Sequence, residues 1–139
     1  MIKRIKDKIG EINKYLNELD EIKPSTLEDY KNSIKDKAAC ERYFEKIIES
    51  VFDISFLIIK YKKLKMPDDD KQLFEILFEN KIISEKVCKK MKSAKGMRNL
   101  LNHQYGNVDD EIVFESITSE INTDVEMFVN EITLHLKLK

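Results

Sequence analysis

Apolar residues recur at intervals of three and four along most of the chain, which is the period of an amphipathic α-helix. The first such stretch covers residues 2–20, and its apolar positions are Ile2, Ile5, Ile9, Ile12, Leu16 and Leu19. Pro24 follows it, and Ser25-Thr26-Leu27-Glu28 has the form of a capping box. We therefore predict a second helix with Ser25 as its N-cap. Because neither glycine nor proline interrupts it, this helix is expected to continue to about residues 61–63.

The second predicted helix is apolar on nearly all sides from Ile47 to Ile59. Such a helix must be covered all round, which predicts a central position with part of its surface at a self-interface. Asp53 is the only charged residue between Ser50 and Ile59. Two interpretations of it stay open: Asp53 reaches solvent beside Glu49, or it holds Arg98 through a charge-assisted bond.

The remaining patterns predict three further helices. Phe74, Leu77 and Phe78 indicate a short helix ending at Asn80, after a turn whose aspartates can act as caps. Ser84 is the expected N-cap of a helix over residues 85–102. The last helix starts at Val108-Asp109-Asp110, and its buried stripe is Ile117, Ile121, Val125, Phe128 and Ile132. His135 lies on or near that stripe, where we expect a structural role.

Composition supports one all-α domain over residues 1–139, with about five helices. Hydrophobic residues make up 42% and charged residues 37%, with three glycines and two prolines. The formal net charge is -1, so any contact with RNA must depend on a local basic patch. Cys40 and Cys88 fit small buried hydrophobes, and without Cys-x-x-Cys or His-x-x-His spacing no metal site is expected. No signal peptide or membrane span is recognisable, which predicts a cytoplasmic protein.

Candidate chemistry is concentrated in residues 96–106, where a helix should end. Arg98 projects from an apolar stripe, and a guanidinium there implies a carboxylate, a phosphate or a subunit boundary. Asn99 lies one turn before His103 on the same face and could orient the imidazole. Gly106 is typical of a helix terminus, which leaves His103 and Tyr105 near an accessible end.

The pattern Arg98-x4-His103-x-Tyr105, with Asn99 directly after the arginine, resembles the active-site motif of the HEPN superfamily, and specifically of its HepT-like ribonuclease toxins. The resemblance also extends over most of the chain, through Glu41-Arg42, Asp53-Ile54, Pro67, Phe74, Leu77, Ile82-Ile83-Ser84, Val108-Asp109 and the last helix. In roughly the first thirty residues only the helical pattern matches.

This resemblance implies an antiparallel helical bundle that forms a homodimer and cleaves RNA without a metal or other cofactor, through a composite site at the dimer interface. Arg98 and His103 would be catalytic, with Asn99 and Asp53 supporting them. Metal-free cleavage needs proton transfer, which one histidine can perform near neutral pH, and a fixed positive charge, which arginine provides. The resemblance further implies that a nucleotidyltransferase antitoxin attaches adenylate to Tyr105; otherwise Tyr105 is an amphipathic anchor.

Several alternatives remain at the level of the sequence. Five lysines, namely Lys86, Lys89, Lys90, Lys92 and Lys95, lead towards Arg98. They are either a solvated helix face or a track for RNA phosphates, with Lys92 and Lys95 as the contact candidates. A non-catalytic HEPN module that binds nucleotide or pairs with a nucleotidyltransferase is the second functional hypothesis. The third is a helical dimerisation protein in which Arg98 and His103 only cap and pair.

Overall fold

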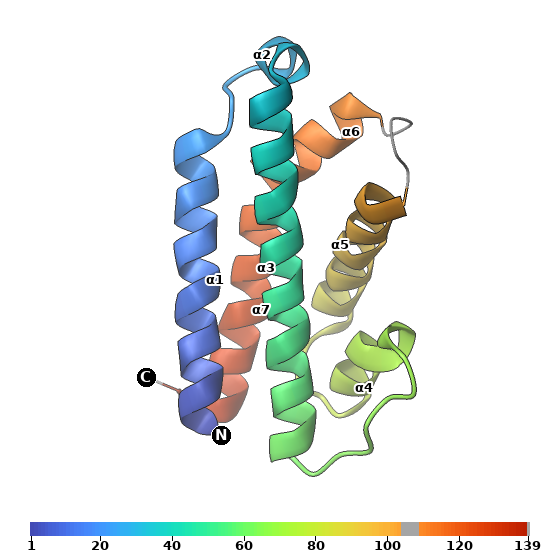
Figure 1. Cartoon of the computed structure of the whole chain (residues 1–139). Helices are drawn as coiled ribbons and strands as arrows, with labels where there is room; N and C mark the ends of the chain where they lie inside the picture. Colours follow the sequence, from blue (N-terminus) through green and yellow to red (C-terminus); the bar gives the residue numbers. More distant parts are fainter. Residues whose placement is uncertain (104–108, 139) are drawn as a thin grey trace.

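Residues 1–103 and 109–138 are described by the computed structural model, with only the backbone described at His103, and they are helical almost throughout (Figure 1). The elements are α1 (Ile2–Ile22), α2 (Leu27–Asn32), α3 (Ile34–Tyr61), a 3-10 turn (Asp70–Gln72), α4 (Leu73–Glu79), α5 (Glu85–His103), α6 (Asp110–Glu115), a π segment (Ser116–Glu120) and α7 (Ile121–Leu136). No strand occurs among these residues. The predicted all-α class is confirmed, and the expected helices are present with two of them divided.

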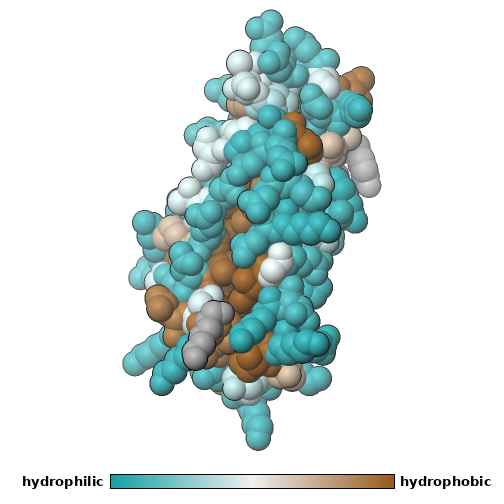
Figure 2. All heavy atoms as spheres, turned by 90° about the vertical axis from the view of Figure 1, so that its left-hand side faces the viewer, coloured by the Kyte–Doolittle hydropathy of each residue, from teal (hydrophilic) through white to brown (hydrophobic). Residues whose placement is uncertain are grey.

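The four longest helices form an antiparallel bundle, as expected. In Figure 1, α1 and α5 run in one direction and α3 and α7 in the other, while α2, α4 and α6 lie at the turns. Both termini are at the same end of the bundle. Seen from the side of α1, the surface is mostly hydrophilic, with hydrophobic side chains showing in a strip between polar ridges (Figure 2). Among the described residues, no helix has the length and apolar character needed to cross a bilayer.

The apolar part of α3 is buried by the chain itself. Ile47, Ile48, Ile54, Ile58 and Ile59 are each at most 1% exposed in a single chain. They belong to one hydrophobic cluster that includes residues of α1, α4, α5 and α7. The predicted central position of this helix is confirmed. The burial of these residues, however, gives no support for a self-interface, because no second chain is needed to cover them.

The prediction of one continuous second helix is wrong, because the helix is interrupted at Ser33. Ser33 has extended backbone angles, φ -122° and ψ 102°, and its Oγ accepts a hydrogen bond from the amide of Asp36 at 3.1 Å. It thus ends α2 and caps α3, which a serine followed three residues later by an acidic residue does readily. The separate α2 buries Tyr30 against Phe114 of α6, with ring centroids 5.4 Å apart. That tertiary contact favours the break.

The last helix contains a π segment that the sequence analysis missed. Its buried positions Val113, Ile117, Ile121 and Val125 are spaced by four residues three times in succession. In an α-helix each step of four residues turns by about 400°, so the stripe would drift by about 40° per step. A π turn closes with a bond from residue i to i+5 and is wider, which keeps the stripe facing the core. The predicted stripe is itself confirmed as buried.

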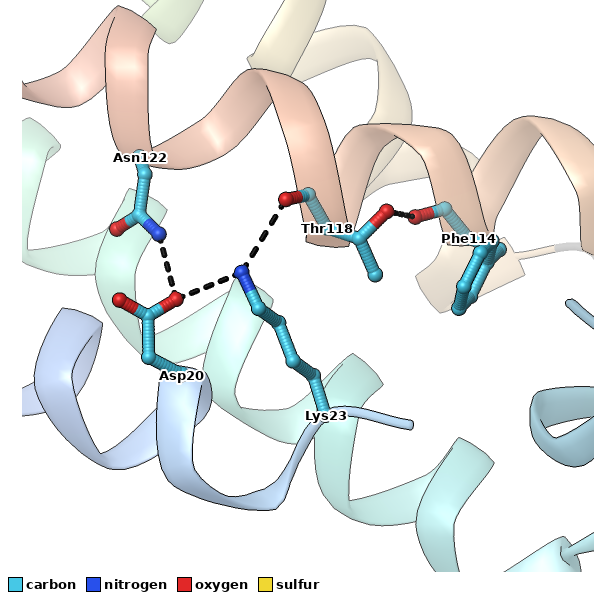
Figure 3. A network of polar contacts seen from close by, with 5 residues as sticks. All are labelled: Asp20, Lys23, Phe114, Thr118 and Asn122. Carbon is cyan, nitrogen blue, oxygen red and sulfur yellow. Dashed lines mark hydrogen bonds and ion pairs between the residues drawn. The ribbon is translucent and has the colours of Figure 1, made fainter. Parts of the chain in front are cut away.

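Polar contacts from α1 hold this π segment in place (Figure 3). Lys23 Nζ donates to the carbonyl oxygen of Thr118 at 3.2 Å and lies 2.7 Å from Asp20 Oδ1. The amide of Asn122 donates to the same Asp20 oxygen at 2.7 Å. The contact with Lys23 lowers the pKa of Asp20, and the hydrogen bond from Asn122 lowers it further. The end of α1 thereby satisfies a backbone carbonyl inside the widened turn.

Candidate functional site

Helix α5 is fixed at its start by the predicted cap. Ser84 Oγ accepts a hydrogen bond from the amide of Val87 at 3.2 Å and donates to Glu131 Oε2 of α7 at 2.8 Å. The amide of Ser84 donates to the other oxygen of Glu131 at 2.7 Å. Ser84 is therefore confirmed as the N-cap, and it also ties α5 to α7. Val87 and Met91 then face the core, which places Arg98 two turns further along the helix.

Arg98 lies between α5 and α3, with its side chain 22% exposed. Its Cζ is 5.4 Å from the centroid of the Phe52 ring. Phe52 packs on Phe74, and Phe74 in turn packs on Phe128 of α7, with centroid distances of 5.9 and 6.4 Å. The guanidinium therefore rests on the end of an aromatic stack that reaches the core. A cation held over an aromatic ring gains about 0.5–2 kcal/mol, depending on how far it is desolvated.

Polar partners use little of the hydrogen-bonding capacity of Arg98. Its Nη1 donates to Asn99 Oδ1 at 3.5 Å, and its Nη2 lies 3.8 Å from Glu49 Oε1. Its Nε is buried and has no hydrogen-bond partner among the described residues. Both polar contacts are long, and the Glu49 carboxylate is largely solvated, so this ion pair contributes little to stability. The result is a positioned positive charge with donors still available.

Of the two interpretations of Asp53, the structure supports the one in which its side chain reaches solvent. Its Oδ2 lies 3.1 Å from Lys8 Nζ of α1, and its side chain is 53% exposed. The hydrogen bond to Asp53 is the main cause that raises the pKa of Lys8. The other interpretation, in which Asp53 pairs with Arg98, does not hold within one chain, because Asp53 lies on the side of α3 that faces α1. Glu49, one turn earlier, is the carboxylate beside Arg98.

The remaining motif residues lie at or beyond the limit of the described structure. Asn99 contacts Arg98, whereas the imidazole of His103 is outside the described side chains, so the orienting role of Asn99 stays a prediction. Tyr105 and Gly106 fall within residues 104–108, outside the described residues. The roles assigned to His103 and Tyr105 also stay predictions.

The lysines of α5 do not form one continuous track. Lys92 pairs with Glu75 of α4, and this hydrogen bond raises the pKa of Lys92. Lys89 pairs with Glu85 at 3.1 Å within α5, while Lys90 lines a cavity on the side of α7. Of the two candidates for contact with RNA, Lys95 makes no ion pair with a described residue. Lys92 is already neutralised by a carboxylate, because it lies on the side of α5 that faces α4.

A second group of cations, which the sequence analysis missed, lies beside Glu49. Lys8, Arg42 and Lys46 line a depression of about 250 Å³ between α1 and α3, together with Glu49 and Asp53. Lys46 Nζ lies 5.0 and 5.5 Å from the ring centroids of Tyr15 and Tyr43. Nothing in the sequence marks these residues as neighbours, because they come from two helices whose relative placement is a property of the fold.

The described residues contain no group of three or more histidine, cysteine, aspartate or glutamate side chains placed to hold a metal ion. Cys40 and Cys88 are both buried free thiols, as expected. Burial raises the pKa of Cys40 to about 11 and also raises that of Cys88, so neither is an activated nucleophile.

Comparison with known families decides the classification. Residues 12–132 match the family model described as "Ribonuclease HepT-like". The chain belongs to the HepT-like family. The resemblance seen in the motif around Arg98 is thereby confirmed over most of the chain.

Curated relatives of this HepT-like chain carry nuclease names. It is 25% identical over 132 residues to the "tRNA nuclease HepT" of Aphanizomenon flos-aquae, covering 95% of this chain and 89% of that one. The "mRNA nuclease HepT" of Shewanella oneidensis is 25% identical over 88 residues, covering 63% of this chain and 65% of that one. A "Putative RNase" of Archaeoglobus fulgidus is 39% identical over 70 residues, covering 50% of this chain and 52% of that one.

Solved structures share the fold of this HepT-like protein. The tri-AMPylated HEPN toxin of Shewanella oneidensis, in complex with its MNT antitoxin, superposes with a TM-score of 0.85 at 21% identity, covering 94% of this chain and 96% of that one. The cytosolic protein YutE of Bacillus subtilis, described as of unknown function, gives a TM-score of 0.80 at 21% identity and covers 97% of this chain and 90% of that one. The HEPN-type helical fold is thus shown.

Proposed function

We propose that this HepT-like protein is a metal-independent endoribonuclease and the toxin component of a toxin–antitoxin pair. The observation that carries the proposal is the state of Arg98, which is held over Phe52, leaves its buried Nε without a partner among the described residues and makes only long contacts through Nη1 and Nη2. A merely structural arginine would be expected to satisfy its donors within the fold. The ribonuclease names of the curated relatives support the same activity.

The proposed chemistry divides between two side chains. His103 transfers protons, either from the attacking 2′-hydroxyl or to the leaving oxygen, because an imidazole titrates near neutral pH. Arg98 binds the phosphate oxygens, on which negative charge increases in the transition state. Its planar fork suits two oxygens at once, and its charge does not depend on pH in the physiological range. Asn99 supports the guanidinium through its contact with Nη1.

RNA reaches this site, in our proposal, over the cations next to it. Lys95 lies one turn before Arg98 on α5, and Lys46 lines the depression on the other side of Glu49. Lys8 and Arg42 line the same depression but are paired with Asp53 and Glu45, so they contribute only after they leave these carboxylates. Lys92 contributes only after it leaves Glu75. Because the net charge of the whole chain is -1, this local group has to provide the electrostatic attraction.

The active form that we propose is a homodimer in which two motif helices meet. One Arg98 and one His103 offer little for a reaction that needs a base, an acid and charge stabilisation. Two protomers would supply two of each.

The inhibitor that we propose is a nucleotidyltransferase antitoxin that attaches adenylate to Tyr105, two residues from His103. The added bulk and negative charge would exclude an RNA backbone by sterics and repulsion. The structural relative described as a tri-AMPylated toxin in complex with an MNT antitoxin supports this form of control.

The deciding experiment is cleavage of total RNA by the purified protein in the presence of a chelator, beside the variant His103→Ala. We expect cutting by the wild type that is lost in the variant, while circular dichroism shows the same helical content for both. Equal cutting by both proteins would refute the catalytic role of His103. Stoichiometric nucleotide binding without turnover, by a wild type shown to lack adenylate on Tyr105, would instead establish the non-catalytic HEPN module.

A further inference from the structure

A cavity of about 220 Å³ lies between α3, α5 and the last helix, and Arg98 is not among the described residues that line it. Its apolar wall comes from Phe44, Ala94, Met97 and Ile121. Its polar groups include Lys90, Glu120 and Asp124. None of these residues takes part in the proposed cleavage of RNA.

Asp124 is the unusual member of the cavity. Its side chain faces the cavity although the residue is only 9% exposed, and it forms no hydrogen bond or ion pair with a described residue. Its oxygen atoms are not fully buried, so the carboxylate is open to a ligand that enters the cavity. Lys90 lines the same cavity without pairing with Asp124. Two carboxylates and one ammonium group therefore line the cavity, and Asp124 is the carboxylate that a cationic ligand can reach beside the apolar wall.

The π segment creates this arrangement. Ser116, Glu120 and Asp124 follow one another at intervals of four residues, and all three line the cavity. The widened turn keeps them on one side, for the same reason that it keeps Ile117 and Ile121 in the core. Lys23 and Asp20 hold the turn from its other side (Figure 3). π turns inserted in helices often occur at functional sites.

We propose that this cavity binds a short aliphatic amine or diamine. The ammonium group pairs with Asp124, the methylene groups lie against Met97 and Ile121, and a second ammonium group reaches the exposed Glu120 at the mouth. At about 30 Å³ for each water-sized group, the cavity has room for roughly seven non-hydrogen atoms. A four-carbon diamine fills such a space with apolar contact in its middle and charge at its ends.

The test compares three ligands of one chain length: 1,4-diaminobutane, n-butylamine and n-butanol. Binding is followed by titration calorimetry and by the NMR shift of the Met97 methyl group, with exposed Met66 as the reference signal. We expect the diamine to bind more tightly than the monoamine, and butanol to bind at least about tenfold more weakly than the monoamine, which is the loss of about 1.4 kcal/mol from one charge-assisted bond. Equal binding of butanol and butylamine would refute the proposal.

Two carboxylate variants separate this site from general attraction to an acidic surface. Asp124→Asn keeps the shape of the side chain and removes its charge, and we expect it to weaken butylamine at least about tenfold. The matched control is Glu126→Gln, which removes one exposed charge from the same helix and should leave the affinity unchanged. Equal losses in both variants would show nonspecific attraction only and would overturn the assignment.

Two further variants probe the cavity by volume and by local charge. Ala94→Leu places extra methyl groups in the cavity and should abolish binding without unfolding the helix, since leucine is a good helix former. Lys90→Gln removes a competing cation and should tighten binding. Unchanged affinity in the folded Ala94→Leu protein would refute the site. Because none of these readouts uses RNA, the result is independent of the ribonuclease proposal.

Discussion

The contacts of Arg98 depend on the shape of its guanidinium group as well as on its charge. The guanidinium lies over Phe52, and its Nη1 and Nη2 atoms contact Asn99 and Glu49. An ammonium group keeps the charge but has neither the planar fork nor the stacking surface. At this position, lysine should therefore fail to replace arginine.

We expect Arg98→Lys to lower kcat/KM for RNA cleavage by about 10²–10³, the usual loss when a preorganised donor to the transition state is removed. Phe52→Leu keeps Arg98 itself and removes only the ring below it, so its loss should be smaller, about tenfold. Single-turnover cleavage of one defined RNA measures both. Cleavage by Arg98→Lys at the wild-type rate would show that charge alone suffices.

In the proposed mechanism, Glu49 and the RNA backbone would compete for the guanidinium of Arg98. Its carboxylate lies 3.8 Å from Nη2 of Arg98. We expect Glu49→Gln to lower KM several-fold, because repulsion between the carboxylate and the RNA backbone disappears. The control is Glu126→Gln, which removes one exposed carboxylate from α7. An equal effect of both variants would indicate a change in net charge only.

At the level of single helices, the N-cap of α2 differs from the one that the sequence predicts. The sequence pattern favoured Ser25 as the N-cap of the second helix, but in the structure Thr26 Oγ1 accepts the hydrogen bond from the amide of Asp29 at 3.1 Å. Thr26→Ala should lower the free energy of unfolding by about 1 kcal/mol, and Ser25→Ala should change it little. Urea unfolding followed by circular dichroism measures both. The reverse order would restore Ser25 as the cap.

The helical elements that could be predicted depend on local signals. Ser84, the span of α5 and the buried stripe of the last helix all follow from periods and caps within one segment. The break at Ser33 has a local signal too, in the acidic residue three positions later, but burial of Tyr30 against Phe114 favours it, and that contact joins distant parts of the chain. The apolar positions of the π region follow one another at intervals of four residues three times in succession. In a regular α-helix such a stripe would drift around the helix axis, so this spacing is the sequence signal for the π segment.

The candidate site was predictable in its residue types but not in its contacts. Arg98 within an apolar stripe pointed to a special environment, and the structure confirms that its side chain is largely covered. Which carboxylate lies beside it depended on competition from Lys8, a residue of α1 that lies 45 positions before Asp53 in the sequence. Phe52 gave no signal, because one aromatic residue among many apolar ones is ordinary core.

For the molecule as a whole, α5 is the element on which three separate environments meet. Val87 and Met91 face the core, Arg98 faces α3, and Ala94 and Met97 face the cavity beside α7. Because α5 is tied to α7 through Ser84 and Glu131, a rotation of α5 would change all three at once.

The proposed composite site makes a prediction that only the assembled protein can test. Arg98→Ala and His103→Ala should each be inactive alone. If Arg98 of one protomer works with His103 of its partner, a heterodimer of the two variants contains one intact pair. Random mixing makes about half of the dimers mixed, each with one of two pairs, so about a quarter of the wild-type activity should return. Unfolding and refolding the two variants together, followed by the RNA assay, measures this recovery, and the separately refolded variants are the control. If the pair instead acts within one chain, or if one site needs both pairs, the mixture would stay inactive although dimers form, and the arrangement of two independent pairs across the interface would be refuted.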